Sequence, residues 1–243
     1  MTIRFSVEEF AKLKELLLIY EWGQRTLLTK LAIVHEDFEN FQEINPIDHI
    51  RGRIKAPESI AEKLHKFGLD ITAGNAKKYI YDIAGVRIIC PFAKDIYNLV
   101  ELIRSMPDIT LIEEKDYVRY PKKTGYRSYH LIVAIPIFYS GRTELVTIEI
   151  QIRTEAMNFW ATLEHEARYK YQGTIPQHLS DELVFCADEI AELDNRMFMI
   201  HENIMGGTHD LHNGAKEGKD KITWIKKPTR RELRRNYRHF QKT

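Results

Sequence analysis

The sequence predicts an α/β (α+β) domain with a mixed sheet of about five strands flanked by helices. Apolar residues recur at helical spacing in the first and last thirds of the chain, and short β-branched runs lie between them. The elements follow one another as helices, one strand, a helix, three strands and helices. This order indicates a single core between a sheet and the helices that cover it.

The first elements are helical. Ser6-Val-Glu-Glu9 is a capping-box pattern that opens a helix. PESIAEKLHKFG (57–68) has proline at its start, glycine at its end and Phe67 on its apolar face. A short helix over NAKKYIYDI (75–83) then leads into a buried strand, GVRIICPF (85–92).

The second half of the chain contains the remaining strands. KDIYNLVELIRSM reads as a helix that stops before Pro107, and three strands and two helices follow it. These elements are expected over 94–106 (helix), 109–118, 128–138 and 144–153 (strands), and 155–171 and 180–205 (helices).

Charge divides the chain into a domain over 1–205 and a basic tail over 206–243. The tail has 11 Lys and Arg against 4 Asp and Glu, whereas the preceding residues have 25 against 31. The tail also loses apolar periodicity, so it either folds on a partner or stays flexible. Any contact with nucleic acid is expected only through this tail.

Composition excludes several classes of protein. Of 243 residues, 44% are hydrophobic and 29% are charged, as in an ordinary globular protein. The apolar runs are too short to span a bilayer, and no signal peptide is visible. Cys90 and Cys186 are the only cysteines, which argues against a disulfide scaffold or a cysteine zinc site. A reducing cytoplasm is the expected location.

The strand TIEIQIRT (147–154) raises the question of function. Its three isoleucines alternate with polar residues, so Ile148, Ile150 and Ile152 should face the core. Glu149, Gln151 and Arg153 would then share the other face. That face is either an ordinary solvated strand surface or the floor of a site for a polar, charged ligand.

Two further segments with candidate site residues precede this strand, a basic one and one that contains an aspartate. In HIRGRIK (49–55), the cations Arg51, Arg53 and Lys55 alternate along the chain, and Lys63 follows on the next helix. They form a solvated basic turn, or they hold phosphates from one side of an extended segment. In DIAGVRIIC, Asp82 lies where a helix meets a strand, either as a helix-terminus residue or as a ligand of Mg²⁺.

A third cluster, DYVRYPKKTGYRSYH (116–130), surrounds a glycine turn. Lys122, Lys123 and Arg127 flank Tyr126, whose ring is suited to stacking on a base while cations hold phosphates. The alternative is a hairpin turn with an exposed aromatic residue. Taken together, the three clusters and Glu149 favour a nucleotide site with Mg²⁺, although neither of the common glycine-rich nucleotide loops is present.

These motifs resemble a known family. GRIK, DIAGVRIIC, DYVRYPKKTGYRSYH, EIQIRT and AMNFWATLEHEARYKY occur in unbroken order over roughly residues 10–205, and the series is similar to the synthetase domain of the RelA/SpoT family. The short form is that of the small alarmone synthetases, most like the RelP-type branch. The resemblance implies a nucleotidyltransferase-like synthetase fold.

The resemblance also implies the activity of a GTP pyrophosphokinase. Such an enzyme transfers the β,γ-pyrophosphate of ATP to the 3′-hydroxyl of GDP or GTP, which yields AMP and (p)ppGpp, the alarmone of the stringent response. The chain has no room for the family's hydrolase domain, so synthesis without hydrolysis is expected. Which acceptor is preferred, and whether the alarmone regulates the enzyme, stay open.

Motif positions imply roles for individual residues. Asp82 and Glu149 would hold one Mg²⁺, and Glu149 would also accept the proton of the 3′-hydroxyl. The remaining residues would bind the two nucleotides. They are Arg53 and Arg87 (adenine), Lys55 and Lys63 (donor phosphates), Tyr126 (guanine), Lys122 and His130 (acceptor phosphates), and Gln151 and Asn158 (acceptor side).

Two further interpretations concern binding and assembly. A domain that binds guanine nucleotides or RNA without reacting is the alternative function, although binding alone would not need two carboxylates. Apolar residues spaced by three and four along 180–205 predict an oligomer contact, and the family resemblance implies a homotetramer. These residues are Leu183, Cys186, Ile190, Leu193, Met197, Ile200 and Ile204. The segment His35-Glu36-Asp37, in contrast, is expected to be a solvated helix face.

Overall fold

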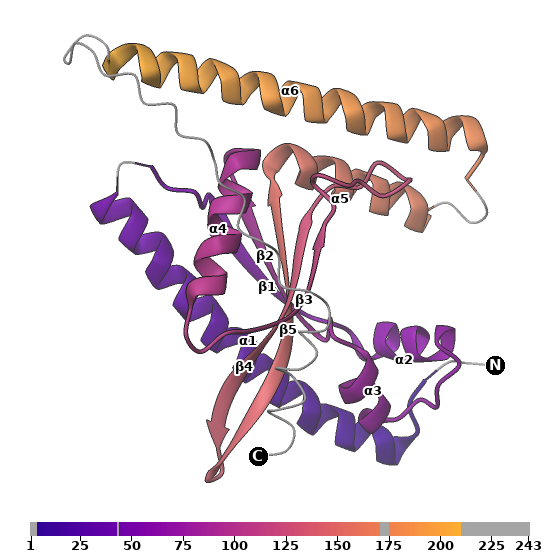
Figure 1. Ribbon diagram of the computed structural model, residues 1–243. Coiled ribbons are helices and arrows are strands. Elements are labelled where there is room, and N and C mark those ends of the chain that lie inside the picture. The colour runs from indigo at the N-terminus through magenta and orange to yellow at the C-terminus, as the bar shows by residue number, and fades with distance from the viewer. Residues whose placement is uncertain (1–3, 43, 171–174, 210–243) are drawn as a thin grey trace.

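The computed structural model describes residues 4–42, 44–170 and 175–209 (Figure 1). The basic tail beyond His209 lies outside the described residues. None of the described helices is both long enough and apolar enough to cross a bilayer.

Five strands form one mixed sheet, as the sequence predicts (Figure 1). Their order across the sheet is β1-β2-β5-β4-β3, with β2 and β5 parallel and the other neighbours antiparallel. The strands are β1 (His49–Ile54), β2 (Ala84–Cys90), β3 (Thr110–Asp116), β4 (Tyr129–Tyr139) and β5 (Arg142–Thr154).

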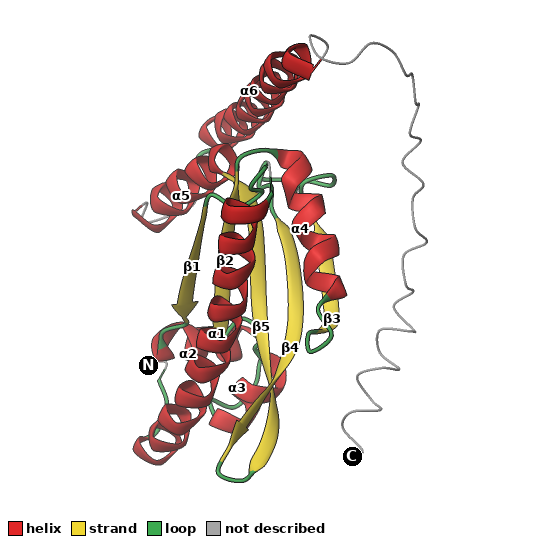
Figure 2. Cartoon of the chain, turned by 90° about the vertical axis from the view of Figure 1, so that its left-hand side faces the viewer, coloured by secondary structure: helices red, strands yellow, loops and turns green. Residues whose placement is uncertain are grey.

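Helices cover one face of this sheet and both of its ends (Figure 2). The long α1 and the shorter α4 pack on the core face, α2 and α3 lie near one end, and α5 and α6 lie across the other. Their bounds are α1 (Val7–Phe41), α2 (Pro57–Lys66), α3 (Ala73–Tyr79), α4 (Ala93–Ser105), α5 (Glu155–Lys170) and α6 (Gln177–His209).

The core confirms the reading of the central strand. Ile148, Ile150 and Ile152 of β5 are fully buried in the same apolar cluster as Leu13 and Leu27 of α1. Burying them removes a large apolar area from water, which is the main stabilising contribution in such a domain. Glu149 and Gln151, which alternate with these isoleucines, therefore lie on the opposite face of β5.

The predicted starts at Ser6 and Pro57 are confirmed, but other helix bounds differ, since the helices expected from 75 and 180 start at Ala73 and Gln177. Ser6 caps α1 by accepting a hydrogen bond from the Glu9 amide at 3.2 Å. Phe67, expected on the apolar face of α2, is 53% exposed. The helix expected over 75–83 stops at Tyr79, because the buried Ile80 is already extended. The last helix continues beyond 205 to His209.

The segment read as a basic turn or extended chain is the edge strand β1. Gly52 lies at its centre, and a Cβ there would come within 2.8 Å of Leu28 Cδ1 and 2.9 Å of Gln24 Cδ on α1. The glycine lets α1 approach the strand, while the alternating Arg51 and Arg53 point away from the helix. With so few apolar residues, β1 gives only a weak strand signal.

The α6 helix packs on the glycine turn before β4. Gly125 has φ +88°, and a Cβ added to it would lie 2.6 Å from Ala187 Cβ. Beside it, Trp160 of α5 donates its ring N–H to the Leu183 carbonyl of α6 at 2.9 Å. Together, these contacts fix the turn that carries Lys122 and Tyr126.

Gly125→Ala should therefore destabilise the domain by about 2–4 kcal/mol, because left-handed strain and a clash with α6 add together. The measurement is the free energy of unfolding in urea. Gly141→Ala is the matched control, since Gly141 has φ +76° but nothing within 4 Å of an added Cβ. Equal losses in the two variants would show that α6 does not constrain the turn.

Candidate active site

Polar residues line the sheet face opposite α1 and α4 in two rows. Cross-strand pairing puts Arg53, Gly85, Glu149, Ile132 and Glu113 in one row. The next row contains Arg51, Arg87, Gln151, His130 and Lys115. Residues separated by many positions in the sequence are thus brought onto one surface, and five of them were assigned roles in the site: Arg53, Glu149, Arg87, Gln151 and His130.

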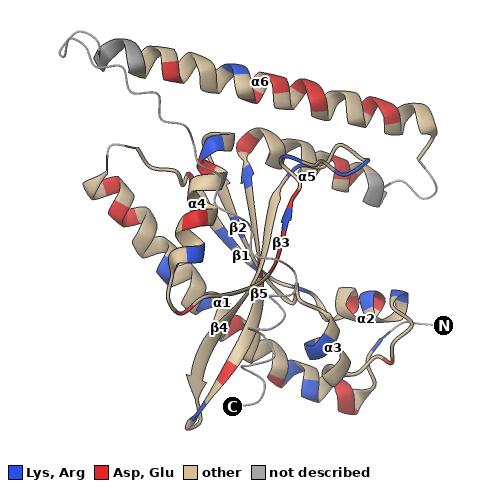
Figure 3. Cartoon of the chain, viewed as in Figure 1, with Lys and Arg blue, Asp and Glu red and all other residues tan. Residues whose placement is uncertain are grey.

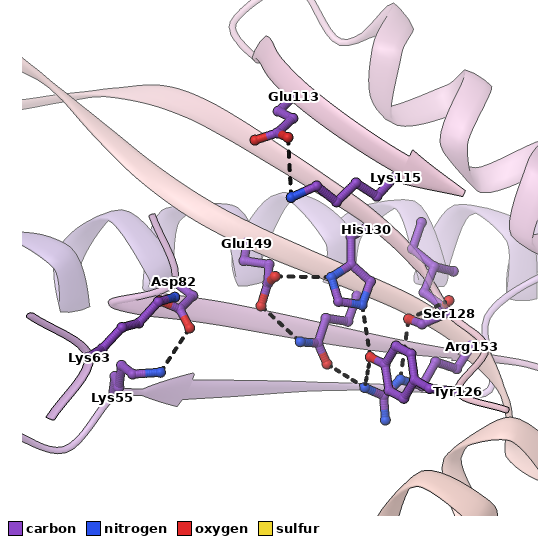
Figure 4. A network of polar contacts seen from close by, with 12 residues as sticks. Lys55, Lys63, Asp82, Glu113, Lys115, Tyr126, Ser128, His130, Glu149 and Arg153 are labelled. Atoms are coloured by element: carbon purple, nitrogen blue, oxygen red, sulfur yellow. Dashed lines mark hydrogen bonds and ion pairs between the residues drawn. The ribbon is translucent and has the colours of Figure 1, made fainter. Parts of the chain in front are cut away.

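Glu149 lies at the centre of this surface (Figure 4). His130 Nδ1 is 3.0 Å from its Oε1, and the Gln151 amide donates to its Oε2 at 2.8 Å. Burial alone would raise the pKa of Glu149, but the hydrogen bonds from His130 and Gln151 outweigh burial and lower it. Glu149 is therefore a carboxylate at neutral pH, held at both oxygens.

Asp82 lies in the turn before β2, between two lysines (Figure 4). Lys55 and Lys63 each donate to one of its oxygens at 2.8 Å. Burial would raise the pKa of Asp82, and the two ammonium groups lower it despite that penalty. The structure thus joins two residues expected to contact donor phosphates to an expected metal ligand.

The two carboxylates fit a hard cation that is shared with phosphates. Asp82 and Glu149 are both ionised, and each oxygen accepts only one of the hydrogen bonds above, which leaves lone pairs for a metal. Among the described residues no group of three acidic, histidine or cysteine side chains could close around an ion. Such a donor set suits Mg²⁺, which is usually bound by one or two carboxylates together with water and substrate phosphates.

Tyr126 is held by cations and hydrogen bonds. Lys122 Nζ lies 4.6 Å from the centre of its ring, and the Arg153 guanidinium carbon lies 5.0 Å away. The ring also packs against the cluster formed by Trp160 and Ala187. Burial raises the pKa of Tyr126. The residue is half-buried and anchored, and not the freely exposed aromatic residue of the hairpin alternative.

Arginines occupy the β1–β2 side of the surface. Arg53 and Arg87 are diagonal neighbours on adjacent strands. This placement is compatible with the expectation that their two guanidinium groups enclose an adenine ring. Burial lowers the pKa of Arg87, and the nearby Arg153 lowers it further. Arg87 Nη1 donates to Asn158 Oδ1 at 3.3 Å, which links the expected donor side to a residue expected on the acceptor side.

Sequence reasoning missed the contribution of β3. A hollow of about 160 Å³ beside Glu149 and His130 is also lined by Glu113, Lys115 and Tyr117. Lys115 lies opposite His130 on the neighbouring strand. The sequence does not reveal this pairing, because it depends on the register of β3 against β4. The alternation of Lys115 with Glu113 on a strand was the available signal.

From the sequence, Arg153 was expected on the polar face of β5 with Glu149 and Gln151, but it was assigned no role of its own. The structure buries it to 4% exposure and connects it to Tyr126, Ser128 and Gln151. Arg153 continues the alternation of Glu149 and Gln151 along the strand. The sequence therefore did indicate that it shares their face.

Comparisons with known proteins agree with this arrangement. A model of the region found in RelA / SpoT proteins matches residues 52–174. The chain is 43% identical over 191 residues to GTP pyrophosphokinase YwaC of Bacillus subtilis (strain 168), covering 79% of this chain and 91% of that protein. It is 36% identical over 185 residues to GTP pyrophosphokinase YjbM of the same strain, covering 76% and 86%. The solved structure of small alarmone synthetase 1 from Bacillus subtilis, bound to its product pppGpp, superimposes with a TM-score of 0.76 and 34% identity, covering 80% of this chain and 99% of that chain.

Asp82→Asn should lower the free energy of unfolding by about 1–3 kcal/mol near neutral pH, because two half-buried ammonium groups lose their carboxylate. Since the pKa of Asp82 is depressed in the folded state, its contribution is present above the ordinary aspartate pKa and is lost as pH falls through the folded value. The gap between wild type and variant should therefore narrow as pH falls from neutrality to below the ordinary aspartate pKa.

The measurement is urea unfolding across that pH range. Asp108→Asn is the control, since Asp108 forms one exposed pair with Lys30 at 2.5 Å and its loss should be nearly silent. A gap for Asp82→Asn that stays constant with pH would contradict the ion-pair assignment.

Proposed function

The chain belongs to the RelA/SpoT family, and we propose that it is a GTP pyrophosphokinase that makes (p)ppGpp from ATP and GDP or GTP. The observation that carries the proposal is the arrangement around Glu149 on the two-row surface. Asp82, in the turn before β2, is close enough to Glu149 to affect it, arginines lie on the β1–β2 side, and Tyr126 lies among cations on the other side. The names of its relatives favour this enzyme over an inactive nucleotide-binding or RNA-binding module.

The donor half of the reaction falls to β1, β2 and α2. Arg53 and Arg87 would enclose the adenine, and Lys55 and Lys63 would turn from Asp82 to the transferred phosphates. Asp82 and Glu149 would hold one Mg²⁺, which supplies neutralisation of phosphate charge when bound. Phosphoryl-type transfer depends mostly on positioning and such neutralisation, so no covalent nucleophile is required.

The acceptor half falls to β4, β5 and the turn before β4. The Tyr126 ring would stack on guanine, Lys122 and His130 would contact the acceptor phosphates, and Gln151 and Asn158 would line its other side. Glu149 would take the proton of the 3′-hydroxyl as that oxygen bonds to the β-phosphorus of ATP. The bond from that phosphorus to the oxygen of the α-phosphate breaks, and AMP leaves.

Some expectations stay predictions. They are the absence of hydrolysis, the RelP-type branch, the cytoplasmic location, the preferred acceptor and any binding of nucleic acid by the tail. The tail itself lies outside the described residues.

The test is to resolve the nucleotides formed from ATP and Mg²⁺ with GDP or GTP. AMP and the 3′-pyrophosphorylated product should appear together, and only with an acceptor. Glu149→Gln should reduce turnover by roughly 10²–10⁴-fold, because the amide cannot accept the proton. Excess Mg²⁺ should partly restore Asp82→Asn but not Glu149→Gln.

Glu144→Gln is the matched control for this test. Glu144 lies on the same strand but pairs with Lys77 and Tyr139 away from the site, so its amide variant should keep near-native turnover. Circular dichroism checks folding in each variant. Near-native turnover of a folded Glu149→Gln protein would remove Glu149 from the reaction.

We also propose that α6 joins copies of the chain into a homotetramer. The helix divides its apolar residues between two sides. Leu183 and Ile190 pack on the domain, while Leu193, Met197, Ile200 and Ile204 are 52–63% exposed. An exposed row of this kind supports an interface with another copy.

Light scattering at micromolar concentration should therefore show an oligomer. Ile200→Glu should dissociate it, because a charge would be buried in the contact. Phe138→Glu is the control, since Phe138 is 74% exposed on the β4–β5 hairpin, away from α6. A monomeric wild-type protein would end the proposal.

A further inference from the structure

Arg153 is a buried cation whose partners are neutral. It is 4% exposed, and its hydrogen bonds within the described residues go to the Tyr126 hydroxyl at 2.6 Å, the Gln151 amide oxygen at 2.7 Å and Ser128 Oγ at 3.3 Å. A buried charge is normally paired with an opposite one. Here a single nitrogen, Nη2, holds both Tyr126 and Gln151.

These two partners lead to the same carboxylate by different routes (Figure 4). The Tyr126 hydroxyl lies 2.8 Å from His130 Nε2, and His130 Nδ1 lies 3.0 Å from Glu149 Oε1. On the other route, Gln151 Nε2 lies 2.8 Å from Glu149 Oε2. The five side chains close a ring of hydrogen bonds that begins at Arg153 and ends at Glu149.

One direction of hydrogen bonding around the ring satisfies every donor and acceptor. A guanidinium only donates, so the Tyr126 oxygen and the Gln151 carbonyl accept from Arg153. The Tyr126 oxygen keeps one hydrogen to donate, and His130 Nε2 at 2.8 Å accepts it when that nitrogen is the bare one of a neutral ring. His130 Nδ1 and Gln151 Nε2 therefore carry hydrogens, and both donate to Glu149, which as a carboxylate only accepts.

We propose that Arg153 is a positioning residue that aligns Tyr126, His130 and Gln151 so that their hydrogen bonds converge on Glu149. It acts through these side chains and does not need to touch a nucleotide. Lysine could not replace it, because the planar guanidinium fork presents two donors from one nitrogen at fixed angles. The kinetic part of the proposal rests on the proposed function, but the direction of the bonds does not.

The direction is tested on the free protein by nuclear magnetic resonance of ¹⁵N-labelled histidine. His130 should carry its hydrogen on Nδ1 alone, protected from exchange with water. In Arg153→Lys that protection should fall at least about tenfold, as expected when a charged hydrogen bond that anchors the ring is lost. Hydrogen on Nε2, or unchanged protection in the variant, would overturn the proposal whether or not the protein makes an alarmone.

The kinetic test compares Arg153→Lys alone and together with Tyr126→Phe, which removes the hydroxyl but keeps the ring. For the single variant, kcat/KM for GDP should fall about 10- to 100-fold, while the KM for ATP should change less than about threefold. The effect of Arg153→Lys should shrink when Tyr126→Phe is already present. Equal effects in both backgrounds would show that Arg153 does not act through that hydroxyl.

Arg104→Lys is the matched control. Arg104 also contacts a tyrosine hydroxyl, that of Tyr129 at 3.4 Å, but it lies on α4, outside the ring of five residues. It should leave both the His130 signal and the acceptor kinetics near wild type. The positioning role would be overturned if Arg153→Lys lowered kcat/KM equally for ATP and GDP and Arg104→Lys did the same. That result would indicate that both substitutions loosen the whole domain.

Discussion

The parallel pairing of β2 with β5 is the constraint on which the candidate site depends. Its register puts Gly85 beside Glu149 and Arg87 beside Gln151, and it brings the turn carrying Asp82 to the same face. A parallel pair needs a long connection, and here that connection is α4, β3 and β4. The strand that supplies His130 is therefore inserted on the other side of β5, so that β2 and β4 flank the strand that carries Glu149.

The site has more positive than negative charge around that carboxylate. Arg51, Arg53, Arg87 and Arg153 are close enough for Arg87 to be affected by the other three. Such repulsion costs stability, and the domain offsets it with the isoleucine-rich core below the sheet. Figure 3 shows that α6 differs from this surface, because acidic residues predominate along the helix. A polyphosphate matches the sign and spacing of the sheet surface far better than a neutral ligand would.

Periodicity predicted what depends on local sequence. The alternating isoleucines of β5 specified its buried face, and Ser6 specified the start of α1, because both signals are contained within a few residues. The edge strand β1 was harder, since its fit to α1 depends on Gly52 and on residues of another helix. The pairing of Lys55 and Lys63 with Asp82 and the burial of Arg153 depend on register and tertiary packing. Neither strand register nor tertiary packing can be read directly from a single sequence.

The turn at Gly125 also limits how this chain can vary. Its φ is positive, and a Cβ added to it would lie only 2.6 Å from Ala187 Cβ, so no side chain fits at that position without a shift of its neighbours. Substitutions that alter the part of the site next to this turn must therefore arise at neighbouring positions, or on α6 together with a change in the turn. The effects on stability of a mutation on α6, where it faces the turn, and of one beside Tyr126 are then not additive. A substitution that the fold tolerates with one α6 sequence can unfold the domain with another.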